Sequence, residues 1–302
     1  MKKWNLIVDV ALCENCNNCV LAAKDELVDN AFPGYSVPHE RQGRGVVWLE
    51  RRTRGSAHMV DTAYRPAMCG HCDAGPCLAA GADGAVRKRE DGIVLIDPVK
   101  ARGRRDLVDA CPYGAIVWNE AEQVPQNWFF DAHLLDAGWT APRCTAVCPT
   151  QAIEAVRVSD EDMAARAEAE RLRTWHPEWS TRPRLYYRNL HRFDRAFVGG
   201  SLLTREGEEV ACVAGARVQL RHGGELVSRT ISDAFGDFRF DDLPPDGVTY
   251  QIGIECDGLL PAVLDVEMED GSRHLGDILL VKQLGPRASG GSTATPVVEH
   301  AL

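Results

Sequence analysis

The spacing of hydrophobic residues divides the chain into parts with different expected secondary structure. Over roughly the first 160 residues, short apolar runs such as 4–10 and 93–96 predict strands. Short helical segments such as 20–29 and 107–110 follow loops that contain cysteine. Strands and helices this short are typical of a small α+β domain, which we place at residues 1–160.

Between about residues 197 and 283, hydrophobic and polar residues alternate with a period of two. The runs 216–221 and 226–231 are separated by Gly223-Gly224, which predicts a tight hairpin. Four further runs are bounded by Gly, Asp or Pro, at 235–240, 248–255, 262–268 and 274–280. The pattern predicts a second domain over residues 197–283, a small all-β sandwich of about seven strands.

A connector of different composition joins the two domains, over residues 161–196. Its first part, 161–173, is rich in Ala, Glu and Arg and predicts a helix, which Pro177 and Pro183 prevent from continuing. Eight arginines and no lysine lie in the connector, with Tyr186, Tyr187 and Phe193 among them: Arg166, Arg171, Arg173, Arg182, Arg184, Arg188, Arg192 and Arg195. Two interpretations are equally supported, a strap on the first domain or a docking surface, because arginine and aromatic residues are enriched in interfaces.

Composition narrows the class of protein. The chain has 302 residues, 45% of them hydrophobic, which is enough for packed cores. Its formal net charge of −10 argues against nucleic acid as a partner, because phosphate binding depends on an excess of Lys and Arg. No run approaches the roughly 18 apolar residues of a membrane span, and residues 1–10 hold no signal-peptide core. We therefore expect a cytoplasmic protein with no direct membrane insertion, and a disordered tail over residues 284–302.

Eleven cysteines at short spacings indicate metal ligands rather than a disulfide framework. Cys13, Cys16 and Cys19 have the spacing with which bacterial ferredoxins hold three corners of an iron–sulfur cubane. The fourth ligand of such a loop comes from a distant Cys-Pro pair, because the loop cannot wrap the far corner. The first triplet therefore needs a remote partner.

A second triplet and two remote Cys-Pro pairs complete the pattern. The triplet is Cys69, Cys72 and Cys77, and the pairs begin at Cys111 and Cys148. Two triplets and two completing thiols predict two 4Fe–4S clusters, and spacing alone allows either Cys-Pro to complete either triplet. Zinc is disfavoured, since a zinc site needs only four ligands and seldom uses a third cysteine three residues on.

The other candidate ligands are assigned to packing. His71 and His133 lie near these motifs, but a histidine beside a cluster loop is more often a hydrogen-bonding or packing residue. Cys144, Cys212 and Cys256 lack spaced partners and are expected to be small buried apolar residues.

The sequence contains an internal repeat from which ligands are missing. Residues 111–116 match residues 148–153 in register, which indicates that one ancestral unit was doubled. The positions at which further cysteines would extend the array to four clusters hold other residues: Ala23, Gly81, Ala101, Arg104, Leu107, Trp128 and Asp131. Two complete ligand sets are therefore absent, two are intact, and Cys144 is left over.

These motifs resemble the iron–sulfur subunits of the molybdopterin (dimethyl sulfoxide reductase) superfamily, and within it most closely the small subunits of pyrogallol–phloroglucinol transhydroxylase and its relatives. The resemblance covers about residues 3–195 and is carried by Cys13 to Cys19, Cys69-Gly70-His71-Cys72-Asp73-Ala74-Gly75-Pro76-Cys77, Ala110-Cys111-Pro112-Tyr113-Gly114-Ala115, Trp118-Asn119-Glu120, 132–139 and 142–150. It implies a duplicated bacterial-ferredoxin-type domain followed by the β-sandwich.

Family topology pairs the first motif with the last and the second with the third. The resemblance therefore implies one cluster on Cys13, Cys16, Cys19 and Cys148, and another on Cys69, Cys72, Cys77 and Cys111. In relatives with four clusters these two lie at the ends of the array. Because electron tunnelling falls steeply with distance, loss of the middle pair would interrupt long-range electron transfer.

The C-terminal domain carries a second resemblance. Residues 232–244, with Gly215-Ala216-Arg217-Val218 before them, are similar to carboxypeptidase-regulatory-like or transthyretin-like domains. The transhydroxylase small subunit carries a similar domain, which favours that branch of the family. Nothing in this domain is typical of catalysis, and its aspartates at 233, 237, 241 and 242 are interpreted as solvated turn residues rather than calcium ligands. We expect this C-terminal domain to have a docking or covering role.

No paired nucleophile and base, phosphate loop or nucleotide fingerprint is present, so we expect the substrate chemistry to occur elsewhere. The resemblance implies a large partner subunit that binds molybdopterin guanine dinucleotide with Mo or W and acts on hydroxylated aromatics, as a transhydroxylase or a phenol or resorcinol hydroxylase. Two alternatives remain. One is an electron-transfer subunit of a respiratory molybdopterin oxidoreductase. The other is a mainly structural subunit, in which the clusters serve to stabilise the fold.

Overall fold

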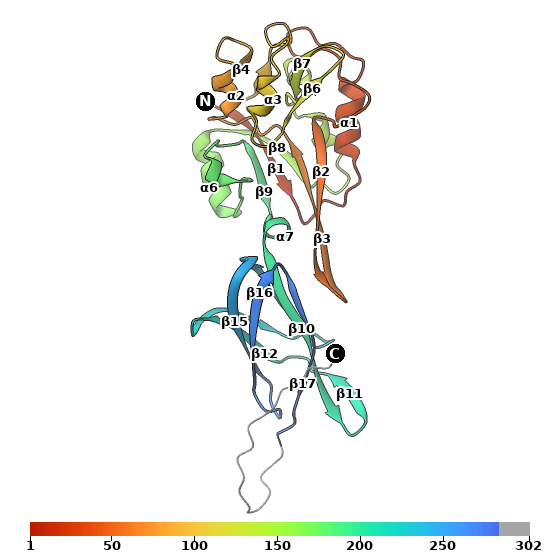
Figure 1. Cartoon of the computed structure of the whole chain (residues 1–302), viewed down its shortest axis with the longest axis vertical. Coiled ribbons are helices and arrows are strands. Elements are labelled where there is room, and N and C mark those ends of the chain that lie inside the picture. The colour runs from red at the N-terminus through yellow and green to blue at the C-terminus, as the bar shows by residue number, and fades with distance from the viewer. Residues whose placement is uncertain (284–302) are drawn as a thin grey trace, which may run out of the picture. The chain divides into compact units, whose positions relative to one another are not determined.

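The computed structural model describes residues 1–283, and these divide into two units. The first comprises residues 1–52 and 63–193, and the second comprises residues 53–62 and the chain from Asp194 onward (Figure 1). None of the helices in residues 1–283 is long and apolar enough to cross a membrane.

A three-stranded sheet forms the centre of the first unit. Strand β1 (Lys3–Asp9) lies between β8 (Ile153–Val158), which is antiparallel to it, and β9 (Leu185–Arg188), which is parallel. Every residue of β1 after Lys3 is buried. The mainly apolar run 4–10 of the sequence, which includes Asn5 and Asp9, therefore forms a strand that is buried along almost its whole length.

Short two-stranded ladders carry the loops of the first unit. They are β2 (Val47–Ser56) with β3 (Met59–Met68), β4 (Val86–Lys88) with β5 (Val94–Ile96), and β6 (Ile116–Asn119) with β7 (Val124–Asn127). The helices are equally short: α1 (Asn18–Leu27), α2 (Pro76–Ala80), α3 (Asp106–Asp109), α4 (Ala132–Asp136), α5 (Arg143–Ala146), α6 (Asp160–Ala169), a 3₁₀ turn (Pro177–Trp179) and α7 (His191–Asp194). Such an arrangement places loops, rather than helix faces, at the centre of the unit.

The connector helix is shorter than the sequence pattern predicts. Helix α6 begins at a well-formed cap, where the Ser159 hydroxyl accepts from the Asp162 N–H at 3.0 Å. It ends at Ala169, and Arg171 adopts a left-handed backbone with φ of 52°. This turn allows Leu172 to pack with Met163 and Ile7. The apolar contact therefore outweighs the helical propensity of residues 170–173.

The second unit is predominantly β. One sheet has the order β11 (Glu209–Cys212), β10 (Ala196–Glu206), β14 (Asp237–Leu243), with β17 (Arg273–Leu280) also paired to β10. The other has the order β13 (Glu225–Ile231), β12 (Arg217–His222), β15 (Asp246–Glu255), β16 (Ala262–Asp270). Residues of both sheets, such as Leu202 and Ile252, share one hydrophobic core. The described chain thus has eight strands here, where the sequence pattern predicts about seven.

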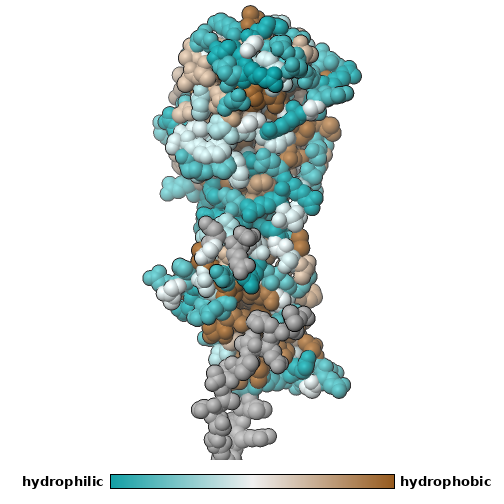
Figure 2. Space-filling model, in the orientation of Figure 1, coloured by the Kyte–Doolittle hydropathy of each residue, from teal (hydrophilic) through white to brown (hydrophobic). Residues whose placement is uncertain are grey.

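Hydrophobic side chains remain exposed on this β unit. Leu226, Val227 and Ile231 of the edge strand β13 are 40%, 49% and 64% exposed, and Val263 of β16 is 57% exposed. In the view of Figure 2, hydrophobic patches lie among the strands of this unit, while hydrophilic residues predominate over the first unit. Apolar residues on an edge strand are a feature of surfaces that pair or dock.

The tip of the β2–β3 hairpin belongs to the β unit and is fixed by a buried arginine. Arg54, whose side chain is 2% exposed, lies 2.7 Å from both Asp61 and Asp241. The turn beside it requires glycine. Gly55 has φ of 85°, and a Cβ there would lie 2.1 Å from the Met59 carbonyl and 2.5 Å from the Phe197 ring.

We predict that Gly55→Ala destabilises the β unit by about 2 kcal/mol or more, because it adds a steric clash to an unfavourable backbone conformation. The control is Gly207→Ala, where φ is 64° but nothing lies within 4 Å of the new Cβ, so only backbone strain of about 1 kcal/mol is expected. Chemical unfolding of the full chain measures both. Equal effects of the two substitutions would contradict the close packing inferred at Gly55.

Candidate iron–sulfur sites

The first cysteine triplet lies on the loop that leads from β1 into α1. Asn15 and Asn17, between the thiols, adopt left-handed backbones with φ of 58° and 61°. Successive turns of this kind aim backbone N–H groups into one concavity, and the Asn15 N–H donates to the Cys13 sulfur. Cys19 is the second residue of α1. The loop thus presents three sulfurs to one side.

Cys148 completes this group from the loop after α5. The pKa of the Cys19 thiol is raised to about 11, mainly by burial and in addition by the charges of Cys13, Cys16 and Cys148. The same neighbours act on Cys13. The structure therefore brings Cys148, rather than Cys111, to the first triplet.

The second triplet and Cys111 line one cavity, together with apolar side chains that include Val86, Val94 and Ile96. Burial raises the pKa of Cys72 to about 12 and that of Cys77 to about 11, with Cys111 adding to both. Burial also raises the pKa of Cys69 well above its usual range, and Cys111 and Cys77 contribute. The four thiols of the second quartet thus share one largely dehydrated space.

Polar groups around the second quartet donate to sulfur. The Ala115 N–H lies 3.4 Å from the Cys111 sulfur. The side chain of Asn127 donates to Cys69 and that of Thr181 to Cys72, which lowers the pKa of each thiol against the effect of burial. Hydrogen bonds to the sulfurs are among the features that tune iron–sulfur clusters.

Each quartet supplies four thiols, which is the number of ligands that a 4Fe–4S cubane requires. Within residues 1–283 no group of three or more His, Cys, Asp or Glu is arranged to hold one metal ion. Zinc requires its sulfurs at about 2.3 Å from a common centre, whereas each thiolate of a cubane binds its own iron at a separate corner. The sulfur-lined cavity and its N–H donors are the surroundings that such a cluster requires.

A partly buried lysine holds the second cysteine loop. The Lys88 ammonium donates to the carbonyls of His71 at 2.8 Å and Cys72 at 3.1 Å. It also donates to the Gly92 carbonyl at 3.1 Å and lies 2.8 Å from Asp73. Because burial lowers the pKa of Lys88 while Asp73 raises it, the cation depends on these partners. Nothing in the sequence pattern singles out Lys88, since its acceptors are mainly backbone carbonyls.

Arg184 of the connector also binds the second cysteine loop. Its guanidinium bonds both carboxylate oxygens of Asp73, at 2.9 and 2.6 Å, and lies 2.9 Å from Asp160. Its backbone N–H donates to the Gly70 carbonyl at 2.7 Å. These bonds favour the interpretation of this part of the connector as a strap on the first domain.

The two histidines near the motifs are hydrogen-bonding and packing residues. His71 accepts the Val94 N–H at its Nδ1, at 3.0 Å, and burial lowers its pKa to about 3, so the ring is neutral at ordinary pH. His133 packs on Phe32 at 4.0 Å between ring centroids, and its Nε2 lies 2.7 Å from Glu26.

Packed side chains occupy one of the positions from which ligands are missing. Ala23, Trp128 and Cys144 are buried in one hydrophobic cluster. The Trp128 indole N–H and the Arg143 backbone N–H both donate to Asp131, at 3.3 and 2.8 Å. Burial raises the pKa of this carboxyl group. A cluster at this place would have to displace an indole ring.

The second missing set is filled in the same way. Ala101 and Leu107 are fully buried, and a Cβ at Gly81 would lie 2.4 Å from a methyl carbon of Val86. Arg104 instead turns to Asp83 and Asp106, at 2.6 and 2.8 Å. In the described structure, packed or paired side chains therefore occupy both positions.

Comparison with known proteins identifies the family of the chain. Residues 60–158 match the 4Fe-4S dicluster domain family. Over 283 residues, 93% of this chain and 100% of the relative, the chain is 42% identical to the pyrogallol hydroxytransferase small subunit of Pelobacter acidigallici. The chain belongs to the family of this small subunit. The predicted relationship is thereby confirmed.

More distant relatives also match, over shorter parts of the chain. The dimethylsulfide dehydrogenase beta subunit of Rhodovulum sulfidophilum is 32% identical over 50% of this chain and 47% of its own length. The chlorate reductase beta subunit of Ideonella dechloratans is 34% identical over 44% of this chain and 38% of its own. The chain is an iron–sulfur subunit homologous to the small or beta subunits of molybdopterin enzymes.

We predict that Lys88→Met removes the second cluster, because it leaves three loop carbonyls and Asp73 without their partly buried donor. Iron per chain is expected to fall from about eight to about four, with acid-labile sulfide in parallel. Lys100→Met, at an exposed position outside the site, serves as the control. Unchanged iron in the Lys88 variant would show that the loop holds its shape without this lysine.

Proposed function

We propose that each cysteine quartet holds one 4Fe–4S cluster, the first on Cys13, Cys16, Cys19 and Cys148 and the second on Cys69, Cys72, Cys77 and Cys111. A bound cluster supplies a centre that accepts and releases one electron. At the second site, the chain's own part is to exclude water from the sulfurs, donate hydrogen bonds to them and, through Lys88, place a cation nearby.

The proposed complex contains a large subunit that binds molybdopterin guanine dinucleotide with Mo or W and carries out the substrate chemistry. We propose that this complex acts on hydroxylated aromatics, as a transhydroxylase or a phenol or resorcinol hydroxylase. The supporting observation is identity of 42% over the whole length of the pyrogallol hydroxytransferase small subunit. An alignment over 93% of this chain necessarily includes the β unit, whereas the match to the dimethylsulfide dehydrogenase relative covers half of it.

The filled positions between the sites support a hydroxyl-transfer role over a respiratory one. A respiratory subunit needs a continuous row of centres that conducts electrons to a distant acceptor. Transfer of a hydroxyl group between two aromatic rings has no net redox change, so it tolerates an interrupted row. Trp128 and Leu107, buried at former ligand positions, are the residues that favour this choice.

We also propose the domain division given by the sequence: a ferredoxin-type domain at 1–160, an Arg-rich connector at 161–196 and a β-sandwich at 197–283. The tail at 284–302 lies outside the described residues. Duplication within the first domain is supported by the two Cys-Pro pairs, since β6 begins at Ile116 and β8 at Ile153, each five residues after its cysteine. We place the complex in the cytoplasm and assign docking to the exposed strand β13.

The proposal predicts that the chain purifies with a large molybdenum-bearing or tungsten-bearing subunit, and that the complex transfers hydroxyl groups between trihydroxybenzenes. Metal analysis of the co-purified complex and an assay on 1,2,3-trihydroxybenzene measure this. Clusters that never change oxidation state during turnover would favour the structural alternative. A quinone-dependent activity with a complete electron path would instead favour the respiratory alternative.

A further inference from the structure

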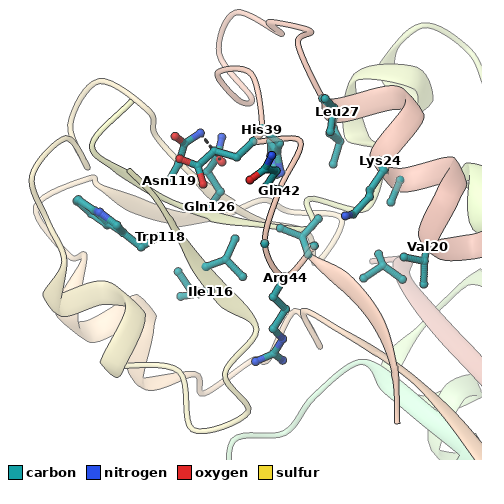
Figure 3. Close-up of a pocket in the computed structure, with 18 of the residues that line it drawn as sticks. Val20, Lys24, Leu27, His39, Gln42, Arg44, Ile116, Trp118, Asn119 and Gln126 are labelled. Carbon is teal, nitrogen blue, oxygen red and sulfur yellow. Dashed lines mark hydrogen bonds between the residues drawn. The ribbon is translucent and has the colours of Figure 1, made fainter. Parts of the chain in front are cut away.

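A cavity of about 320 Å³ lies within the first unit, away from the cysteine sulfurs. It is bounded by α1, by the loop before β2 and by the β6–β7 ladder (Figure 3). This volume is within the range of about 300–1,000 Å³ that small-molecule sites occupy. Ala23, at a former ligand position, forms part of its wall.

The wall of this cavity has an apolar part and a polar part. Val20 and Leu27 of α1 lie on one side, Ile116 lies on the opposite side with the polar residues Asn119 and Gln126, and His39 belongs to the loop between them. The polar side chains are already satisfied: Asn119 bonds Gln126 at 3.0 Å, and Gln126 donates to the Val37 carbonyl at 2.9 Å. His39 contacts Ser36 at 3.1 Å, and burial lowers its pKa to about 4, which keeps it neutral.

Two cations of the cavity wall have no carboxylate partner among the described residues. Lys24 reaches from α1 toward the loop in Figure 3, with Arg44 at the edge of the cavity. Within residues 1–283 neither side chain forms an ion pair, and Arg44 instead lies over the Trp48 ring at 3.7 Å. Glu40 is the acid that lines the same cavity; it accepts two backbone N–H groups, and within residues 1–283 it forms no ion pair with Lys24 or Arg44.

Every nearby acid is engaged elsewhere. On and after α1, Asp25 and Glu26 bond Arg143, and Asp29 bonds Arg41 at 2.7 Å. In the loop, Glu40 accepts the backbone N–H groups of residues 120 and 121 at 2.8 and 3.0 Å. Acids of the β6–β7 turn are paired as well, since Glu120 accepts from Trp118 at 2.6 Å and Glu122 lies 3.6 Å from Arg102.

We infer that this cavity binds a small carboxylate with an apolar body. The carboxylate would pair with Lys24 and Arg44, because charge-assisted hydrogen bonds are the strong ones and arginine suits carboxylate geometry. The apolar body would lie against Val20 and Leu27 of α1, where its burial adds affinity. This inference does not depend on the proposed function, since it rests on groups outside both cysteine quartets.

The test uses benzoate as the probe and benzamide as its neutral counterpart of the same shape. Isothermal titration calorimetry is performed on the co-purified complex and on the iron-loaded full chain. Benzoate is expected to bind both, and benzamide at least about tenfold more weakly, which corresponds to about 1.4 kcal/mol. Binding of benzoate is expected to weaken as salt is added, because an ion pair is screened.

Single-residue variants test whether benzoate binds at this cavity. Lys24→Met is expected to weaken benzoate binding about tenfold, Lys24→Arg to retain most of it, and Lys100→Met to leave it unchanged. Arg44→Met, which lies on an exposed loop, gives an independent measure if the α1 variant is poorly folded. The iron content of each variant is measured separately, so loss of the clusters cannot be mistaken for loss of this site.

Four results would overturn the inference. The first three are the absence of benzoate binding, equal binding by wild type, Lys24→Met and Arg44→Met, and equal binding of benzoate and benzamide. Binding to the chain alone that disappears in the complex would also overturn it, because a carboxylate of the large subunit would then occupy the cations. None of these results bears on whether the complex holds molybdenum and transfers hydroxyl groups.

Discussion

The first unit depends on bringing four thiol groups together twice, with seven of the eight cysteines at least partly buried. Burial raises the pKa of Cys19, Cys72 and Cys77 to about 11 or 12, so an unoccupied site would hold neutral thiols with little mutual attraction. A cluster exchanges those protons for iron–sulfur bonds, and its binding free energy becomes folding free energy. The short helices and two-stranded ladders around the sites are too small to be stable alone. We therefore regard the two centres as the framework on which these elements are ordered.

Around this framework, fixed charges shape the second loop and packed side chains close the space between the sites. Lys88 and Arg184 both bind the second cysteine loop, and each forms an ion pair with Asp73. Where a longer array would place two more clusters, Trp128 and Leu107 are almost completely buried. Packed side chains thus take the place of inorganic centres, which preserves the fold but removes intermediate sites for electron transfer. The proposed hydroxyl-transfer reaction has no net redox change and would tolerate this loss.

The sequence predicted the two parts of the fold and the thiols that come together, because cysteine spacing and strand periodicity are local signals. It missed strand β10, whose Gly199-Gly200 interrupts the apolar run like a turn. A Cβ at Gly199 would lie 2.6 Å from the Phe238 carbonyl, so tight sheet packing, not a turn, requires that glycine. It also missed Lys88 and Thr181, whose roles depend on contacts between segments far apart in the chain. Which Cys-Pro pair joins which triplet was open from spacing and needed the family resemblance.

The most direct test of this account is the number and type of clusters in the co-purified complex. Native mass spectrometry of the small subunit, combined with Mössbauer spectroscopy of the iron, measures both. We predict two 4Fe–4S clusters, one lost on Cys16→Ser and the other on Cys77→Ser. Three or more clusters in the small subunit, or zinc at either quartet, would contradict the account.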